Sequence, residues 1–529
     1  MTYATAQTVS MQGALGHLID VQADVSQGQV GTTLVGRPDT SLNEARDRCR
    51  MAVTNSNLDW PTTRRITVLL SPADLPKRGT HFDLAIAVAV LAAADVVPAA
   101  SLSGTVFLGE LTLTGGLRSV PGVLPMALAA STRGINRVFV PEPQAAEAAM
   151  VPGLTVLGMR SLAQVVAELR GEPVPTAPPV APMSGLRMLA WRGQERMAEV
   201  DMADLLGMAD ARFAVEVAAA GGHHLLLSGP KGAGKTTLAE RIPTILPDLT
   251  PQESLELTAI HSLAGALEPD DGMLVRPPFS APHHDASKVA LLGGGTGGVR
   301  PGEVSRAHCG VLFLDEFPLF RTDAIEALRQ PLESGEVTIA RGEDTATFPA
   351  RGMVVMAANP CPCGNYHPDP SLSRCQCHEV QRRDYRRRVS GPVTDRIDIT
   401  RHLVPLRRHE ARDPFHRPEP SVDVRARVEV ARARQAARYA DRSWRLNGQA
   451  PGPLLRREWP LGDEGQLLLE DQVYDGRLSR RGATRVHRLA WTLADLRDED
   501  QPRVEHVRTA IALRRGDALD LAALERRAG

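Results

Sequence analysis

Cysteine, lysine, net charge and long apolar runs are all scarce in this sequence, and each shortage excludes a class of protein. Six cysteines among 529 residues are too few for a disulfide scaffold, which favours a reducing compartment. The most apolar stretch, residues 84–94, is too short to cross about 30 Å of hydrocarbon, and the N-terminus has no basic-then-apolar signal pattern. We therefore expect a cytoplasmic protein with no membrane partner.

The charges of the chain nearly cancel, with 61 Lys and Arg against 62 Asp and Glu. No global field attracts nucleic acid, so any such site must be a local patch. Only four basic residues are lysines, namely Lys77, Lys231, Lys235 and Lys288, which makes a lysine inside a motif informative. A hydrophobic fraction of 43% with 23% charged residues is typical of globular proteins, and the length predicts about three domains.

The composition changes along the chain divide it into four parts. Residues 1–170 alternate β-rich runs with alanine-rich helical runs, which predicts an α/β domain. Residues 171–185 are proline-rich and predict a linker. Residues 186–403 alternate apolar strands with helices, as in nucleotide-binding α/β folds, and residues 404–529 lose the strand signal and predict a helical domain. Arginine-bearing amphipathic helices are expected there at 425–438 and 480–497.

A phosphate-binding loop is the strongest motif. The residues from Gly229 to Thr236 fit G-x-x-x-x-G-K-[ST], between a strand-like and a helix-like run. In such a loop backbone N–H groups wrap the β-phosphate, Lys235 neutralises the β and γ oxygens, and the Thr236 hydroxyl binds Mg²⁺. The expected ligands are ATP and Mg²⁺. The residues expected to hold them are Gly229, Pro230, Lys231, Gly232, Ala233, Gly234, Lys235, Thr236, Thr237 and Asp315.

Two further strands are expected to end in polar groups beside that loop. Residues 310–314 form a buried run that ends in Asp315 and Glu316, where one acid can hold Mg²⁺ and the next can polarise the attacking water. The run 353–358 ends in Asn359, an amide able to position that water or the γ-phosphate. A turn-forming asparagine before proline is the alternative for Asn359.

A pair of C-x-C units flanks a loop that contains proline and glycine. Four thiolates in this arrangement could close a tetrahedral zinc site, with His367 and His378 as possible substitutes. The alternative is four reduced thiols in a loop. The candidate ligands are Cys361, Cys363, Cys375 and Cys377.

In combination these motifs carry a family resemblance. The phosphate loop, the Leu-Asp-Glu strand and the segments 276–284, 300–316, 358–364 and 390–398 together resemble the AAA+ ATPases of the magnesium-chelatase class, most closely the ComM/YifB family. The resemblance extends over nearly the whole chain. It implies a homo-hexameric ring in which Arg396 is the arginine finger offered to the neighbouring subunit and Arg481 is the sensor-2 arginine.

The resemblance also implies a hairpin that points into the pore of the ring. The sequence supplies strands at 336–340 and 345–349 around a turn of residues 341–344. Arg341 at this turn is a candidate contact to a translocating DNA strand, although an arginine at a hairpin tip is commonly only solvated.

The first domain resembles the Lon-protease-like fold of the same family. No serine stands at 79–83, where an active enzyme would place it, and Leu124 stands where the dyad lysine would be. Because a Ser–Lys mechanism needs both groups, we expect a proteolytically inactive domain that serves oligomerisation or binding.

The leading hypothesis is therefore an ATP-hydrolysing ring motor on single-stranded or branched DNA, a ComM-like branch-migration helicase in recombination or DNA uptake. A magnesium-chelatase motor subunit that drives Mg²⁺ insertion into porphyrin is the alternative, and an ATP-dependent protease is disfavoured by the missing dyad. Between residues 381 and 440 there are 16 arginines against eight acidic residues, which fits phosphate contacts and inter-subunit pairing equally well.

Overall fold

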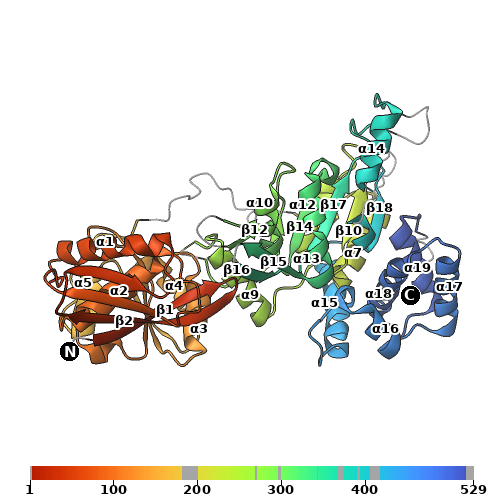
Figure 1. Ribbon diagram of the computed structural model, residues 1–529. Helices are drawn as coiled ribbons and strands as arrows, with labels where there is room; N and C mark the ends of the chain where they lie inside the picture. Colours follow the sequence, from red (N-terminus) through yellow and green to blue (C-terminus); the bar gives the residue numbers. More distant parts are fainter. Residues whose placement is uncertain are drawn as a thin grey trace.

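Three regions follow one another along an elongated molecule in the computed structural model (Figure 1). The N-terminal region lies at one end, a central α/β region in the middle, and a group of helices at the other end. The end of the expected linker lies outside the described residues. The structure describes residues 3–181, 200–268, 271–295, 299–341, 344–366, 373–389, 393–404 and 418–519.

The N-terminal region is built on a seven-stranded mixed sheet in the order β3-β4-β2-β1-β5-β8-β9. The helix α2 is buried along its whole length, which explains why its sequence is apolar all round instead of amphipathic. The strands are β1 (Tyr3–Gln12), β2 (Leu15–Ser26), β3 (Gly31–Val35), β4 (Arg65–Ser71), β5 (Thr105–Phe107), β8 (Arg137–Pro141) and β9 (Thr155–Met159). The helices are α1 (Thr40–Asn55), α2 (Asp83–Ala93), α3 (Val123–Ser131), α4 (Ala145–Ala148) and α5 (Leu162–Arg170).

The central region contains a five-stranded parallel sheet in the order β11-β14-β17-β10-β18. Strands β14 and β17 are buried on both faces, as expected for a parallel sheet covered by helices. The strands are β10 (Leu225–Ser228), β11 (Phe279–Ser280), β14 (Val311–Leu314), β17 (Met353–Ala358) and β18 (Ile399–His402). The helices are α7 (Ala209–Gly221), α8 (Lys235–Ile245), α9 (Pro251–Leu263), α10 (Lys288–Leu292), α11 (Glu303–Arg306), α12 (Thr322–Ala327), α13 (Arg329–Ser334) and α14 (Glu379–Val389).

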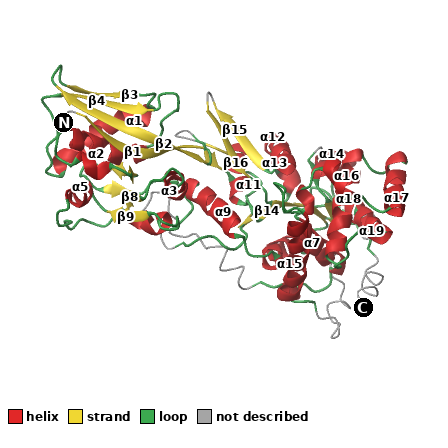
Figure 2. Cartoon of the chain, turned by 90° about the horizontal axis from the view of Figure 1, so that it is seen from below, coloured by secondary structure: helices red, strands yellow, loops and turns green. Residues whose placement is uncertain are grey.

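The predicted hairpin is formed by β15 (Glu336–Arg341) and β16 (Asp344–Pro349) (Figure 2). The ladder extends to the pair Arg341 and Asp344, so Arg341 ends a strand, whereas the sequence placed it in the turn. The physical reason is that two-residue loops match the twist of a hairpin better than longer turns. Residues 342 and 343 lie outside the described residues.

Among the described residues, the N-terminal region contacts the central region through the turn between β1 and β2 and through helix α3. At the turn between β1 and β2, a Cβ on Gly13 would lie 3.0 Å from the backbone nitrogen of Thr347 on β16. Helix α3 packs on α9, where the Gly122 amide donates to the Ser262 carbonyl and the Ser262 hydroxyl donates to the buried carboxylate of Glu147 at 2.5 Å. The two regions are therefore joined by packing as well as by the chain.

The C-terminal region consists of helices. They are α15 (Ser421–Arg438), α16 (Gly452–Glu458), α17 (Asp463–Tyr474), α18 (Arg480–Asp495) and α19 (Val504–Arg515). Helix α15 packs on α7 and α8, α18 packs on α7, and α19 packs on β18. Residues of α15, α17, α18 and α19 share one hydrophobic core with the central sheet (Figure 1). Among the described residues, no helix is both long and apolar enough to cross a membrane.

Candidate nucleotide-binding site

The phosphate loop and both polar strand ends lie at one edge of the central sheet. Strands β14, β17 and β10 are parallel and adjacent, so the residues that follow them emerge together at the carboxyl edge, where α/β sheets bind ligands. Those residues are Asp315 after β14, Asn359 after β17 and Gly229 after β10. The structure thus brings together three motifs that are spread over residues 229–359 of the chain.

Glycine is required at several positions of the loop. A Cβ on Gly229 would lie 2.6 Å from the carbonyl oxygen of Leu403, which follows β18. Gly232 and Gly234 have φ angles of +80° and +81°, a left-handed backbone that side chains rarely adopt. Helix α8 begins at Lys235, so the loop delivers its N–H groups to a helix N-terminus, which suits an anion.

The side chains of Lys235 and Thr236 are hydrogen-bonded to residues of the phosphate loop and of the two neighbouring strand ends. The Lys235 ammonium donates to the carbonyls of Gly229 and Pro230, at 2.7 and 3.0 Å, and to the side-chain oxygen of Asn359 at 3.0 Å. Burial lowers the pKa of Lys235, against the opposing charges of Asp315 and Glu316. The Thr236 hydroxyl donates to Asp315 Oδ2 at 2.9 Å, so a hydroxyl and a carboxylate converge as expected of two Mg²⁺ ligands.

Glu316 follows Asp315 at the same edge of the sheet and lies near Asn359. It has a φ of +48°, a strained backbone of the kind that clusters at functional sites. Its carboxylate lies 3.5 Å from the Asn359 amide nitrogen. Tyr385 of α14 also lies here, although no sequence motif marks it. Burial, together with the charge of Glu316, raises the pKa of Tyr385 to about 12, and its side chain hydrogen-bonds the backbone of Asn359. A long-range contact of this kind leaves no local pattern in the sequence.

Arg396 and Arg481 are not brought to the phosphate loop. Arg396 lies just before β18, at the amino edge of the sheet, and four strand residues at about 3.3 Å each separate that edge from the loop. Its Nη2 lies 2.7 Å from Glu333 Oε1, and the Nη2 of Arg481 lies 3.9 Å from the same atom. Both arginines therefore lie near Glu333, away from the phosphate loop.

The four cysteines do form one cluster. The Sγ atom of Cys361 lies 3.4 Å from that of Cys363 and 3.6 Å from that of Cys375, and Cys363 and Cys375 are 3.7 Å apart. Cys377 belongs to the same group, in which all four Sγ atoms lie within 4.8 Å of one another. A tetrahedral Zn–S site with bonds of about 2.3 Å requires S···S distances of about 3.8 Å, so the donor set fits zinc. His378 is not part of this cluster, and His367 lies outside the described residues.

The cysteine loop packs against the phosphate loop. A Cβ on Gly364 would lie 3.4 Å from the Lys231 side chain and 3.8 Å from Asn359 Cγ. The loop is tied to α14 by Tyr366, whose ring lies 5.0 Å from the guanidinium carbons of both Arg382 and Arg386. A metal here would hold a segment that borders the nucleotide residues.

In the N-terminal region, Leu124 and Lys77 serve structural roles. Leu124 is fully buried, and its amide donates to Glu147 Oε1 at 2.9 Å. The Lys77 ammonium is buried and donates to the Pro72 carbonyl. Neither residue supplies a free amine for a Ser–Lys dyad.

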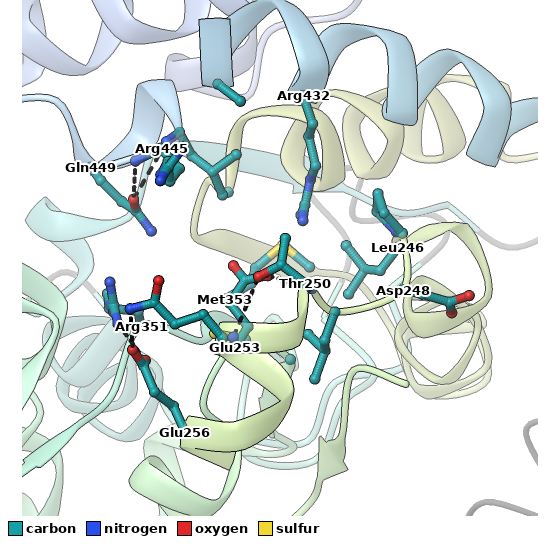
Figure 3. Close-up of a pocket in the computed structure, with 18 of the residues that line it drawn as sticks. Leu246, Asp248, Thr250, Glu253, Glu256, Arg351, Met353, Arg432, Arg445 and Gln449 are labelled. Carbon is teal, nitrogen blue, oxygen red and sulfur yellow. Dashed lines mark hydrogen bonds and ion pairs between the residues drawn. The ribbon is translucent and has the colours of Figure 1, made fainter. Parts of the chain in front are cut away.

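A cavity of about 770 Å³ lies away from all these motifs. It is lined by Gly310 and Met353 at the starts of β14 and β17, so it opens at the amino edge of the sheet, under α15. Figure 3 shows Arg432 reaching into it from α15 and Arg351 paired with Glu256 across its floor. Arg432 donates from Nε and Nη2 to the carbonyl of Ala219 in the last turn of α7. The guanidinium therefore caps the C-terminus of this helix and stabilises the fold.

Comparisons with known proteins identify the family. The family model described as magnesium chelatase, subunit ChlI, matches residues 201–411, its C-terminal counterpart matches 418–514, and a third model for the ChlI subunit matches 21–144. Competence protein ComM of Haemophilus influenzae is 37% identical over 97% of this chain and 98% of its own length. The chain belongs to the ComM/YifB family of magnesium-chelatase-like proteins.

Two other relatives also match nearly the whole chain, whereas a magnesium-chelatase subunit matches only part of it. The uncharacterized protein YifB of Escherichia coli is 38% identical over 98% of both chains, and an uncharacterized protein of Mycobacterium tuberculosis is 45% identical over 98% of this chain and its whole length. A 67 kDa magnesium-chelatase subunit of Chlorobaculum parvum is 28% identical over only 30% of this chain. The membership supports an AAA+ ATPase and does not favour the chelatase alternative.

Proposed function

We propose that this chain is the subunit of an ATP-hydrolysing hexameric ring motor that acts on DNA, a ComM-like branch-migration helicase in recombination or DNA uptake. The observation that carries the proposal is the separation of two half-sites on opposite edges of one sheet. Lys235, Asp315 and Glu316 lie at the carboxyl edge, whereas Arg396 lies at the amino edge. A subunit built in this way needs a neighbour to complete its active site.

The carboxyl edge would bind and cleave the nucleotide. Bound Mg²⁺ would neutralise charge on the β- and γ-phosphates, and Thr236 and Asp315 would hold it. Lys235 would leave the loop carbonyls to contact the phosphates, while Glu316 would orient the attacking water with Asn359 beside it.

The amino edge would serve the next subunit. A guanidinium spreads its charge over the developing charge of the γ-phosphate, so Arg396 offered in trans would make hydrolysis depend on assembly. Head-to-tail contacts of this kind form rings when the rotation closes. Six subunits is the number that the family resemblance implies.

DNA is proposed as the substrate on two structural grounds and one comparison. The hairpin β15–β16 carries Arg341 at the end of its first strand, and helix α14 carries five arginines on 11 residues, which suits phosphate contacts. A relative of nearly equal length is named a competence protein. The arginines of α14 are Arg382, Arg383, Arg386, Arg387 and Arg388.

Two further assignments belong to this proposal. The four-cysteine cluster would hold a structural zinc ion that fixes the loop beside Lys231, since its S···S distances suit tetrahedral bonds. The N-terminal region would be a Lon-like domain without protease activity, because Leu124 is buried and Lys77 is held by a carbonyl.

The test is ATPase turnover with and without DNA, at low salt. Single-stranded or forked DNA should stimulate hydrolysis several-fold, porphyrin should have no effect, and Arg341→Ala should weaken the stimulation while basal turnover stays nearly constant. Robust basal hydrolysis by an assembled ring that neither binds DNA nor responds to it would remove the DNA assignment.

A further inference from the structure

Two arginines from distant parts of the chain share one carboxylate. Glu333 lies on α13, and its Oε1 is 2.7 Å from Nη2 of Arg396 and 3.9 Å from Nη2 of Arg481. Arg396 belongs to the central region, just before β18, whereas Arg481 lies in the first turn of α18 in the C-terminal region. Glu333 is therefore the point at which the two regions bring positive charge together.

The two contacts differ in strength. The Arg396 side chain is only 10% exposed, whereas that of Glu333 is 49% exposed, so solvent screens their short contact from the Glu333 side alone. Arg481 is 65% exposed and sits at the limit of an ion pair, where screening leaves little attraction. Glu333 thus holds Arg396 by a short contact, while Arg481 lies near the same carboxylate.

The charge balance of this group suits an anion from outside. Two guanidiniums and one carboxylate leave a net charge of +1, so the group can still attract phosphate. Without the carboxylate, the two guanidiniums would repel each other and separate. A flexible arginine that must act in one geometry gains most from a partner that restricts its rotamers beforehand.

We propose that Glu333 is the positioning residue of the inter-subunit site: it holds Arg396, with Arg481 beside it, in the arrangement that meets the γ-phosphate bound by the neighbouring subunit. The inference rests on the proposed function, because it requires Arg396 to act in trans. Glu333 touches no substrate itself. It acts through the arginine that it holds.

The first test compares Glu333→Gln with Glu326→Gln. Glu326, on the adjacent α12, pairs with Arg329 on the surface. Glu326→Gln is therefore the matched control, because it also removes one exposed, ion-paired carboxylate. Glu333→Gln should lower kcat for ATP roughly 10- to 100-fold, as expected when a catalytic arginine is misplaced, with KM changed less than about threefold. Glu333→Asp, which keeps the charge, should recover part of kcat, and Glu326→Gln should behave as the parent.

In the opposite role, Glu333 would be inhibitory: its ion pair would keep Arg396 away from the nucleotide of the neighbouring subunit. That role predicts faster hydrolysis in Glu333→Gln, so a kcat equal to or above the parental value would overturn the proposal. So would an undiminished effect of Glu333→Gln in an Arg396→Ala background, because a residue that acts only through Arg396 has nothing left to position there.

Mixed rings decide on which side of the interface Glu333 acts. Glu333→Gln subunits keep their phosphate loop, and Lys235→Ala subunits keep their finger, so mixing the two impaired proteins should raise hydrolysis at hybrid interfaces above that of either protein alone. This recovery also shows that the Glu333→Gln protein is folded. Mixing Glu333→Gln with Arg396→Ala should restore nothing, because both are defective on the finger side.

Arg396→Ala mixed with Lys235→Ala is the reference for the proposed function. If that mixture recovers activity and the Glu333→Gln mixture does not, the positioning role is wrong and the trans site stands. If neither mixture recovers although mixed rings form, the trans site itself is wrong.

Discussion

Asp398→Asn should lower the free energy of unfolding by weakening the packing between the central sheet and the C-terminal helices. Asp398 is 1% exposed, accepts the His224 amide at 2.9 Å and pairs with Arg485 of α18 at 2.6 Å. Burial opposes ionisation, but the charge of Arg485, with His223 and His224 nearby, holds the pKa of Asp398 well below its ordinary value. The carboxylate is therefore ionised at all pH values of practical interest.

The loss of folding free energy in Asp398→Asn follows from the buried Arg485 guanidinium that the substitution leaves without a counter-ion. Asparagine keeps the volume, so no cavity forms, but Arg485, whose side chain is 11% exposed, would stay buried without its counter-ion. Removing one partner of a buried pair costs about 3–5 kcal/mol. With a slope of about 2–3 kcal/mol per molar urea, the unfolding midpoint should fall by about 1.5 M.

Tryptophan fluorescence during urea unfolding suits this measurement, because Trp444, Trp459 and Trp491 all lie in the C-terminal region. Asp248→Asn is the control: its side chain is 54% exposed and its pairs are on the surface, so the loss should be about 1 kcal/mol or less. Since a lowered carboxyl pKa stabilises the fold above about pH 4 and the effect is lost only below it, the difference between Asp398→Asn and the parent should be constant from pH 7 to 9. A shift no larger than that of the control would refute the reasoning.

Three further predictions concern the nucleotide, the metal and acid. Lys235→Ala should abolish ATP binding, whereas Glu316→Gln should bind ATP and hydrolyse it at least about 100-fold more slowly. Parental turnover by the Glu316→Gln protein would contradict the role of Glu316 in orienting water. Elemental analysis should find about one zinc per chain, and Cys363→Ser should lower that content and the thermal midpoint together, whereas a metal-free protein of parental stability would exclude the site. Burial lowers the pKa of His223 and His224 to about 4, so only the unfolded chain takes up these protons as the pH falls from 6.5 toward 4. Stability should therefore fall by up to about 1.4 kcal/mol per pH unit for each histidine, and a midpoint that stays constant over that window would disprove this.

Much of the nucleotide site could be read from local patterns. Lys235, Thr236 and Asp315 belong to short motifs whose spacing follows from one strand and one turn, and parallel pairing brings the strand ends together without further information. Glu333 and Tyr385 could not be found in this way. The contacts of Glu333 with Arg396 and of Tyr385 with Asn359 join segments far apart in the chain, which no local periodicity encodes.

The fold shows the same division. The amphipathic run at 480–497 predicted a helix that the structure contains as α18, although α18 ends at Asp495, two residues before the expected end. The packing of α3 on α9 was not predictable, because it joins segments more than 100 residues apart in the chain. Leu255 and Ala259 of α9 pack against the N-terminal core, and the Gly122 amide donates to the Ser262 carbonyl.

Gly13 shows how one region can constrain the evolution of another. It sits in a turn with a φ of +63°, and the space that a side chain would need is filled by the backbone of β16. Within its own region, an asparagine would satisfy such a turn. Selection against any larger residue there would come from the neighbouring hairpin, so drift at this position should be restricted in relatives that keep both regions and relaxed in any that have lost the hairpin.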